Sequence, residues 1–144
     1  MIHRDTICLL RECDAGIQMG TAAIDDVLGY VQSGGFRECL STCRRHHEQL
    51  GKEIEEALAR FEDDGKAPNA IARGMAWMKA HAQLAATPTD AAVASLITDG
   101  CNMGVKSLGR YLNEYAAADA PSKDIAKRLI ALEEGLAADA RHWL

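Results

Sequence analysis

The chain has 144 residues, nearly half of them hydrophobic, and a formal net charge of −5 at pH 7. This length is typical of one domain with a real hydrophobic core, so we treat residues 1–144 as a single domain. The negative charge leaves no basic face to displace counterions from phosphates, which excludes nucleic acid as a partner. No stretch has the length of a membrane span or the form of a signal peptide, and the cysteine count of five is odd. We therefore expect a cytoplasmic protein with reduced thiols and no membrane partner.

The first two predicted helices form a hairpin. Over residues 5–32, apolar residues recur in alternating steps of three and four, which is the heptad spacing of a packed helix. The glycines of "QSGG" (32–35) are expected to end this helix. A second helix near 36–63 has the same spacing, and the short link predicts that the two helices are antiparallel neighbours. Its predicted buried stripe consists of Phe36, Leu40, Cys43, His47, Leu50, Ile54, Ala57 and Phe61.

Three further helices are predicted. Pro68 suits the first turn of a short helix near 68–86, and a long helix with a threonine cap covers about 89–116. The last helix is expected to start at a Ser122 cap and to reach about residue 142. Its predicted stripe consists of Ile125, Leu129, Leu132, Leu136, Asp139 and Trp143. No strand pattern competes, so we predict an all-α four-helix bundle of two hairpins with a short extra helix in the crossover.

Two segments 84 residues apart resemble each other. They are "GIQMGTAAIDDVLGYV" (16–31) and "GCNMGVKSLGRYLNEY" (100–115), which share the pattern glycine, any residue, amide, methionine, glycine. Because they occupy equivalent places in the two hairpins, we interpret them as remains of a duplicated hairpin. Each glycine costs about 1 kcal/mol relative to alanine inside a helix. The two lines of small residues either let the helices approach closely, which we favour, or leave room for a ligand between them.

This layout resembles the ferritin-like four-helix bundles, and more closely an uncharacterised bacterial ferritin-like family of unknown function. The segments that carry the resemblance are "ECDAGIQMG", "HHEQLGKEI" and "LITDGCNMGVKSL", and the resemblance covers most of the chain. Di-iron members of the fold place glutamates and Glu-x-x-His pairs at the bundle centre. Here the equivalent residues Gln18 and Asn102 are amides, and the nearest match is Asp139-x-x-His142. The resemblance therefore implies a fold rather than a ferroxidase or oxygenase, and we do not expect an enzyme.

Three ionisable residues lie on the predicted buried stripes, namely Asp14, His47 and Asp139. A buried charged side chain is costly unless it is paired or binds a metal. Helix lengths bring His47, Asp139 and Cys101 to a similar level of the bundle, so these three are candidate ligands of a transition metal ion. The weaker candidate ligands are Asp14, Cys43 and His46.

An alternative hypothesis is that these side chains are core polar groups that hydrogen bonds satisfy. In that case the partner of His47 would be Gln18, Asn102 or Thr21. A further alternative is a zinc or copper(I) site of two cysteines and two histidines within three turns of the second helix. Its ligands would be Cys39, Cys43, His46 and His47.

The leading functional prediction is a non-catalytic, cytoplasmic binding or interaction module. The short helix would offer Met75, Trp77 and Met78 as an apolar patch through which a homo-oligomer forms. The alternative is a metal-binding or redox protein with its site around His47. A third hypothesis, a sensor with reactive thiols, requires cysteines that are accessible and ionised.

Overall fold

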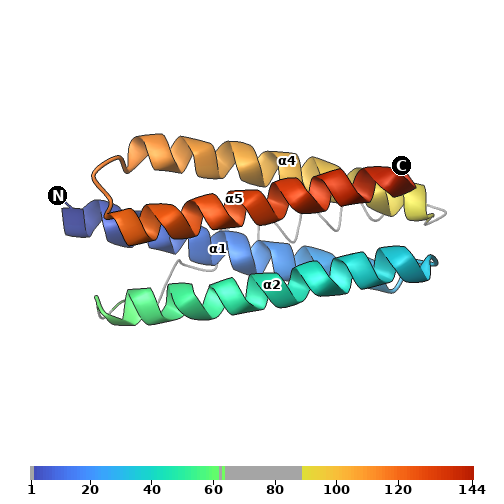
Figure 1. Ribbon diagram of the computed structural model, residues 1–144, viewed down its shortest axis with the longest axis horizontal. Coiled ribbons are helices and arrows are strands. Elements are labelled where there is room, and N and C mark those ends of the chain that lie inside the picture. The colour runs from blue at the N-terminus through green and yellow to red at the C-terminus, as the bar shows by residue number, and fades with distance from the viewer. Residues whose placement is uncertain (1, 62, 64–88) are drawn as a thin grey trace.

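The computed structural model describes residues 2–61, 63 and 89–144, and every regular element among them is helical (Figure 1). The predicted fold class, an all-α bundle, is confirmed for this part of the chain. None of these helices has the length and apolar character needed to cross a membrane. The predicted helix near 68–86 and its methionine and tryptophan patch lie outside the described residues. The elements are α1 (Ile2–Leu28), α2 (Gly34–Ala59), α4 (Asp90–Glu114), α5 (Ala120–Ala140) and a 3-10 turn η1 (Arg141–Trp143).

Side-chain caps define where three of the helices begin. Ser33, Thr89 and Asp119 each accept a hydrogen bond from the backbone N–H three residues later, which satisfies one of the free donors of the first turn. Two predictions are corrected by this result. The glycines at 34–35 form the first turn of α2 instead of ending α1. Ser122 does not cap α5, because its backbone N–H donates to the carboxylate of Asp119.

The four helices run along the long axis of the molecule (Figure 1). α1 packs chiefly on α2, and α4 packs chiefly on α5. In the view of Figure 1, α1 runs from left to right and α2 returns, whereas α4 runs from right to left and α5 returns. The linker 29–33 between α1 and α2 and the linker 115–119 between α4 and α5 are both short. The chain therefore consists of two helical pairs packed against each other.

Two apolar clusters fill the bundle, one toward each end. The first contains Leu9, Ile54 and Leu129 among others, and the second contains Phe36 and Ile97 among others. In each of the four helices, one position lies between the residues of the first cluster and those of the second and belongs to neither. These four positions lie at the same level along the bundle. That level, which we name the central layer, consists of Gly20, His47, Gly104 and Glu133. A polar layer thus divides an otherwise apolar core.

Reciprocal contacts between the two pairs support the duplication inferred from the sequence. Near the start of α1, the Asp5 carboxylate accepts from Ala117 N at 3.0 Å, in the linker between α4 and α5. At the start of α4, the Asp90 carboxylate accepts from Gln32 N at 2.8 Å and from Ser33 N at 2.9 Å, in the linker between α1 and α2. The first helix of each pair therefore fixes the linker of the other pair through an aspartate at its beginning.

The second helices of the two pairs are also equivalent, at a separation of 86 residues. The caps Ser33 and Asp119 have this separation, and so do His47 and Glu133. The core-facing line of α2, which is Phe36, Leu40, Cys43, His47, Leu50 and Ile54, corresponds to Ser122, Ala126, Leu129, Glu133, Leu136 and Ala140 of α5. All of these residues are buried except Glu133, which is of intermediate exposure. His47 and Glu133 therefore occupy corresponding positions of α2 and α5.

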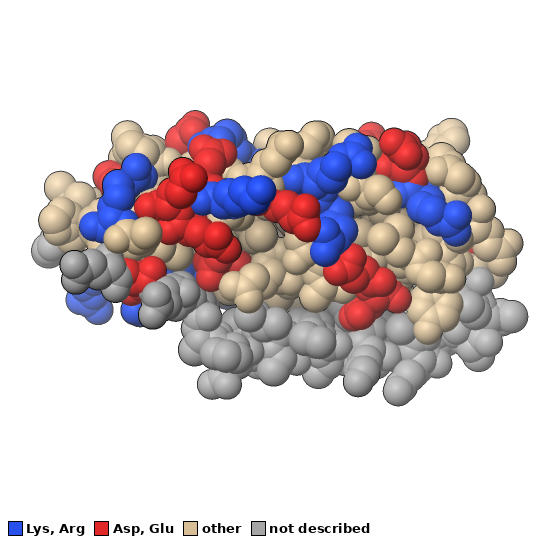
Figure 2. All heavy atoms as spheres, turned by 90° about the horizontal axis from the view of Figure 1, so that it is seen from below, with Lys and Arg blue, Asp and Glu red and all other residues tan. Residues whose placement is uncertain are grey.

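Charged side chains on the surface are of both signs and alternate over the face shown in Figure 2. Some of them link neighbouring helices: Arg44 pairs with Asp25 of α1 at 2.6 Å, and Arg128 pairs with Glu53 of α2 at 2.8 Å. Exposed ion pairs contribute about 0–1 kcal/mol each, because water and salt screen them. The apolar clusters, not these pairs, supply most of the stabilisation.

Candidate functional site

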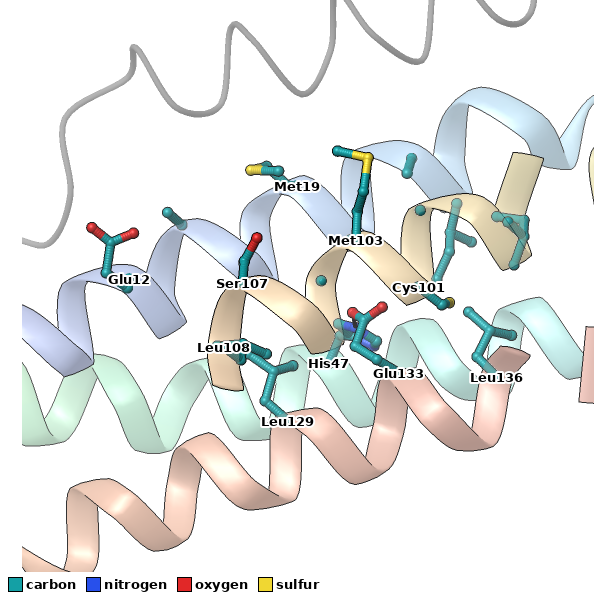
Figure 3. A pocket seen from close by; sticks show the side chains of 18 of the residues that line it. Glu12, Met19, His47, Cys101, Met103, Ser107, Leu108, Leu129, Glu133 and Leu136 are labelled. Carbon is teal, nitrogen blue, oxygen red and sulfur yellow. Dashed lines mark hydrogen bonds and ion pairs between the residues drawn. The ribbon is translucent and has the colours of Figure 1, made fainter. Parts of the chain in front are cut away.

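The side chains of His47 and Glu133 meet in the central layer (Figure 3). The His47 side chain is 1% exposed and that of Glu133 is 12% exposed. His47 Nε2 lies 3.1 Å from Glu133 Oε1. On the other side of the ring, His47 Nδ1 lies 2.9 Å from the backbone oxygen of Cys43, one turn earlier in α2, and 3.4 Å from its sulfur. Both ring nitrogens therefore have a partner, and His47 needs no further hydrogen bond.

These partners determine where the protons lie. A carbonyl oxygen only accepts hydrogen bonds, so Nδ1 carries a proton and donates it to Cys43 O. Nε2 and the carboxylate oxygen then share one further proton. Burial by itself lowers the pKa of His47, but the hydrogen bonds to Cys43 and Glu133 and the negative charge of Glu133 outweigh it and raise the pKa to about 10. At neutral pH the layer contains an imidazolium paired with a carboxylate.

The glycines of the repeat make room for this pair. A Cβ atom on Gly20 would lie 2.9 Å from His47 Cδ2 and Nε2, and one on Gly104 would lie 3.4 Å from Glu133 Oε2. A Cβ on Gly16 would meet only a side-chain atom, Leu129 Cδ2, at 3.4 Å. The neighbours of the glycines are thus side chains of α2 and α5. Our expectation that the glycines draw the first and third long helices tightly together is wrong, and the alternative, space between these helices, is the one that the structure favours.

The space between α1 and α4 is a pocket of about 490 Å³. Both lines of small residues face it, namely Gly16, Gly20, Ala23, Gly100, Gly104 and Ser107. Leucine, isoleucine and methionine side chains form most of the remaining lining. Figure 3 shows His47 and Glu133 in the middle of the floor, with Leu108 and Leu129 on one side and Cys101 and Leu136 on the other. The described lining is therefore mainly apolar, with His47 and Glu133 at its middle and the side chains of Glu12, Ser107 and Tyr111 as further polar groups.

Cys101 joins the His47–Glu133 pair as a neutral thiol. It is buried, and burial, followed by the charge of Glu133 and a hydrogen bond to it, raises the pKa of Cys101. Burial also raises the pKa of Cys13 to about 12 and that of Cys39 to a smaller extent. Thiols that stay protonated at neutral pH are poor nucleophiles. These three cysteines therefore do not support the hypothesis of a reactive-thiol sensor.

The structure brings two of the three leading candidate metal ligands to one pocket, but not the third. His47 and Cys101 line the pocket, whereas Asp139 is exposed and lines a separate groove with Cys39 and His46. Within the part of the chain that the structure describes, no three histidine, cysteine, aspartate or glutamate side chains form a group that could hold a metal ion. The position that the hypothesis gave to Asp139 is taken by Glu133.

The remaining predicted residues have other roles. Asp14 is buried as expected, and it accepts a hydrogen bond from Gln18 Nε2 at 2.9 Å. Thr21 donates to the backbone of its own helix, and Asn102 is exposed. None of the three partners proposed for His47 therefore binds it. The partner that sequence reasoning missed is Glu133, because a search for apolar residues at helical spacing passes over a glutamate.

Comparisons with known proteins add no assignment. The chain matches no protein family, no curated protein and no solved structure.

The raised pKa of His47 predicts a pH dependence of stability. The folded protein holds this proton up to about pH 10, whereas an unfolded histidine loses it near pH 6.5, so stability is full below pH 6.5 and falls as the pH rises. Between pH 6 and 9 we expect the free energy of unfolding to fall by on the order of 2–3 kcal/mol more in the wild type than in His47→Leu. Urea denaturation across this range measures the difference. Because His47→Leu keeps the other titrating groups, parallel curves for the two proteins would contradict the prediction.

Proposed function

We propose that the protein is a binding module that holds a small, mostly apolar molecule in the pocket between α1 and α4. The observation that carries this proposal is a mainly apolar described lining with the His47–Glu133 pair at the middle of the floor. A volume of about 490 Å³ lies within the range of small-molecule sites, which are lined mainly by apolar side chains with a few polar groups that orient the ligand.

We also propose that the fold is ferritin-like, with two antiparallel hairpins and a crossover between them. The course of the four helices in Figure 1 and the reciprocal contacts of Asp5 and Asp90 support this arrangement. The alternative of a metal site around His47 has no comparable support. A histidine ligand needs a free nitrogen lone pair, and both nitrogens of His47 are engaged by Cys43 and Glu133.

Binding of an uncharged solvatochromic dye tests the proposal. We expect the wild-type protein to bind the dye in a one-to-one complex, with the blue-shifted emission of an apolar environment. Gly104→Leu adds a side chain to the pocket lining and is expected to weaken binding at least about tenfold, because the ligand and the new side chain compete for the same space.

The matched control is Gly109→Leu, the same substitution on the same helix. A Cβ atom on Gly109 meets nothing within 4 Å, and Gly109 does not line the pocket. This variant is expected to bind the dye like the wild type. Circular dichroism and urea denaturation confirm that both variants are folded. Absence of dye binding to the wild type, or equal affinities of the two leucine variants, would refute the proposed site.

A further inference from the structure

The central layer also limits the chemistry of the ligand. We propose, on the basis of the binding function above, that the polar end of the ligand is an uncharged hydrogen-bond donor, such as a hydroxyl group or an amide N–H, that donates to Glu133 Oε2. The rest of the ligand is apolar. The inference depends on two properties of the layer, its hydrogen-bonding capacity and its charge.

Glu133 offers only acceptor capacity to the pocket. Its Oε1 is engaged by His47 Nε2 at 3.1 Å, and Oε2 lies beside Gly104, where the missing side chain leaves it uncovered by the helix. The proton of this pair lies between Nε2 and Oε1, so Oε2 is an acceptor whichever of the two groups holds the proton. The Cys101 thiol takes part of the remaining capacity. A carboxylate has about four acceptor sites, so at least one is left for a donor on the ligand.

The net charge of the layer is zero. His47 and Glu133 together hold one positive and one negative charge, or none if the proton has moved to Glu133. A cationic ligand would leave the layer neutral only if His47 lost its shared proton. His47 cannot lose it, because the lone pair of the deprotonated Nε2 would then face a carboxylate oxygen at 3.1 Å. An anionic ligand would place a second negative charge beside the carboxylate of Glu133. Burying either charge without a partner is costly, so a charged head group is disfavoured.

The other ionisable groups of the pocket do not change this conclusion. Besides His47 and Glu133, the described lining contains Glu12, Cys101 and Tyr111. Cys101 stays protonated, and Glu12 lies at the far end of the pocket in Figure 3, away from Glu133. None of them supplies a positive charge beside Glu133 for an anionic ligand. The donor on the ligand is therefore both uncharged and placed at the centre of the pocket.

Displacement of the solvatochromic dye by four eight-carbon or size-matched compounds tests this inference on the wild-type protein at pH 7. The probes are 1-octanol, which is a neutral donor; 1-methoxyheptane, a neutral acceptor of the same size; octanoate, an anion; and octylammonium, a cation. We expect 1-octanol to displace the dye at a concentration at least about tenfold lower than each of the other three compounds, since each of those leaves Oε2 without a donor or adds a charge that the layer cannot balance.

The outcomes separate this inference from the binding function. If the ether or either charged compound equals 1-octanol while Gly104→Leu still weakens all of them, the pocket binds ligands but the assignment of a neutral donor is wrong. If no compound displaces the dye, or Gly104→Leu changes nothing, the binding function itself is wrong. A tenfold preference for the alcohol that disappears in Gly104→Leu supports both.

Discussion

Gly20→Ala is expected to lower the free energy of unfolding by about 1–3 kcal/mol, although alanine normally stabilises a helix relative to glycine by about 1 kcal/mol. The new methyl group would lie 2.9 Å from two atoms of the His47 ring. The ring has no room to retreat, because it is 1% exposed and held at both nitrogens by Cys43 and Glu133. Urea denaturation at pH 6, where the pair is fully formed, measures the effect.

Gly109→Ala is the control for this experiment. Its methyl group meets nothing within 4 Å, so we expect it to leave stability unchanged or raise it by up to about 1 kcal/mol. In the double variant Gly20→Ala/His47→Ala the overlap with the ring disappears, and the effect of the methyl group should disappear with it. A Gly20→Ala protein as stable as the wild type would show that the ring does not occupy the position described here.

Removal of one member of the central pair is expected to have the largest effect in the molecule. Glu133→Met keeps the size of the side chain but leaves the buried His47 ring without its charged partner, and we expect a loss of about 3–5 kcal/mol. His47→Leu should cost less, because the Glu133 side chain is 12% exposed and is therefore less completely buried than His47. The double variant His47→Leu/Glu133→Met replaces the pair by apolar groups and is expected to recover most of the stability.

A double-mutant cycle at pH 7 measures this coupling. The pKa of His47, followed by NMR, gives a second readout that a packing effect alone would not change. In Glu133→Met the pKa should fall, because burial lowers it and Glu133 no longer opposes that effect. Additive stability losses together with an unchanged pKa would show that the two side chains do not interact.

The helices and one of the two polar residues could be predicted from the sequence. The three-four spacing of α2 identifies its buried line, including His47, because every core position but His47 is filled by an apolar residue. In α5 the same method selects Leu132 over Glu133, since it looks for apolar residues. The resulting line is correct at Ile125, Leu129 and Leu136, but it places Asp139 in the core, whereas Asp139 is exposed and its neighbour Ala140 is buried.

The repeat in the sequence does not identify Glu133 either, because its separation of 84 residues pairs His47 with Ala131. The separation of 86 residues that pairs His47 with Glu133 follows from the helix caps Ser33 and Asp119, which the structure identifies. The pocket is harder to predict, because a line of small residues is compatible with two helices in contact and with two helices apart. Whether the two helices touch or stay apart depends on the side chains that the other helices place against the glycines, which here are His47 and Glu133. Those contacts exist only in the assembled bundle.

The corresponding positions of His47 and Glu133 have a consequence for the symmetry of the bundle. Two identical hairpins related by a two-fold axis would present the same residue twice at this position, so a histidine would face a histidine and a glutamate would face a glutamate. An acid can face a base across such an axis only when the two copies are free to differ, as they are once they are fused in one polypeptide. A histidine facing a glutamate at this one position is therefore an arrangement that two hairpins within one polypeptide can adopt and that a symmetric dimer of one hairpin could not.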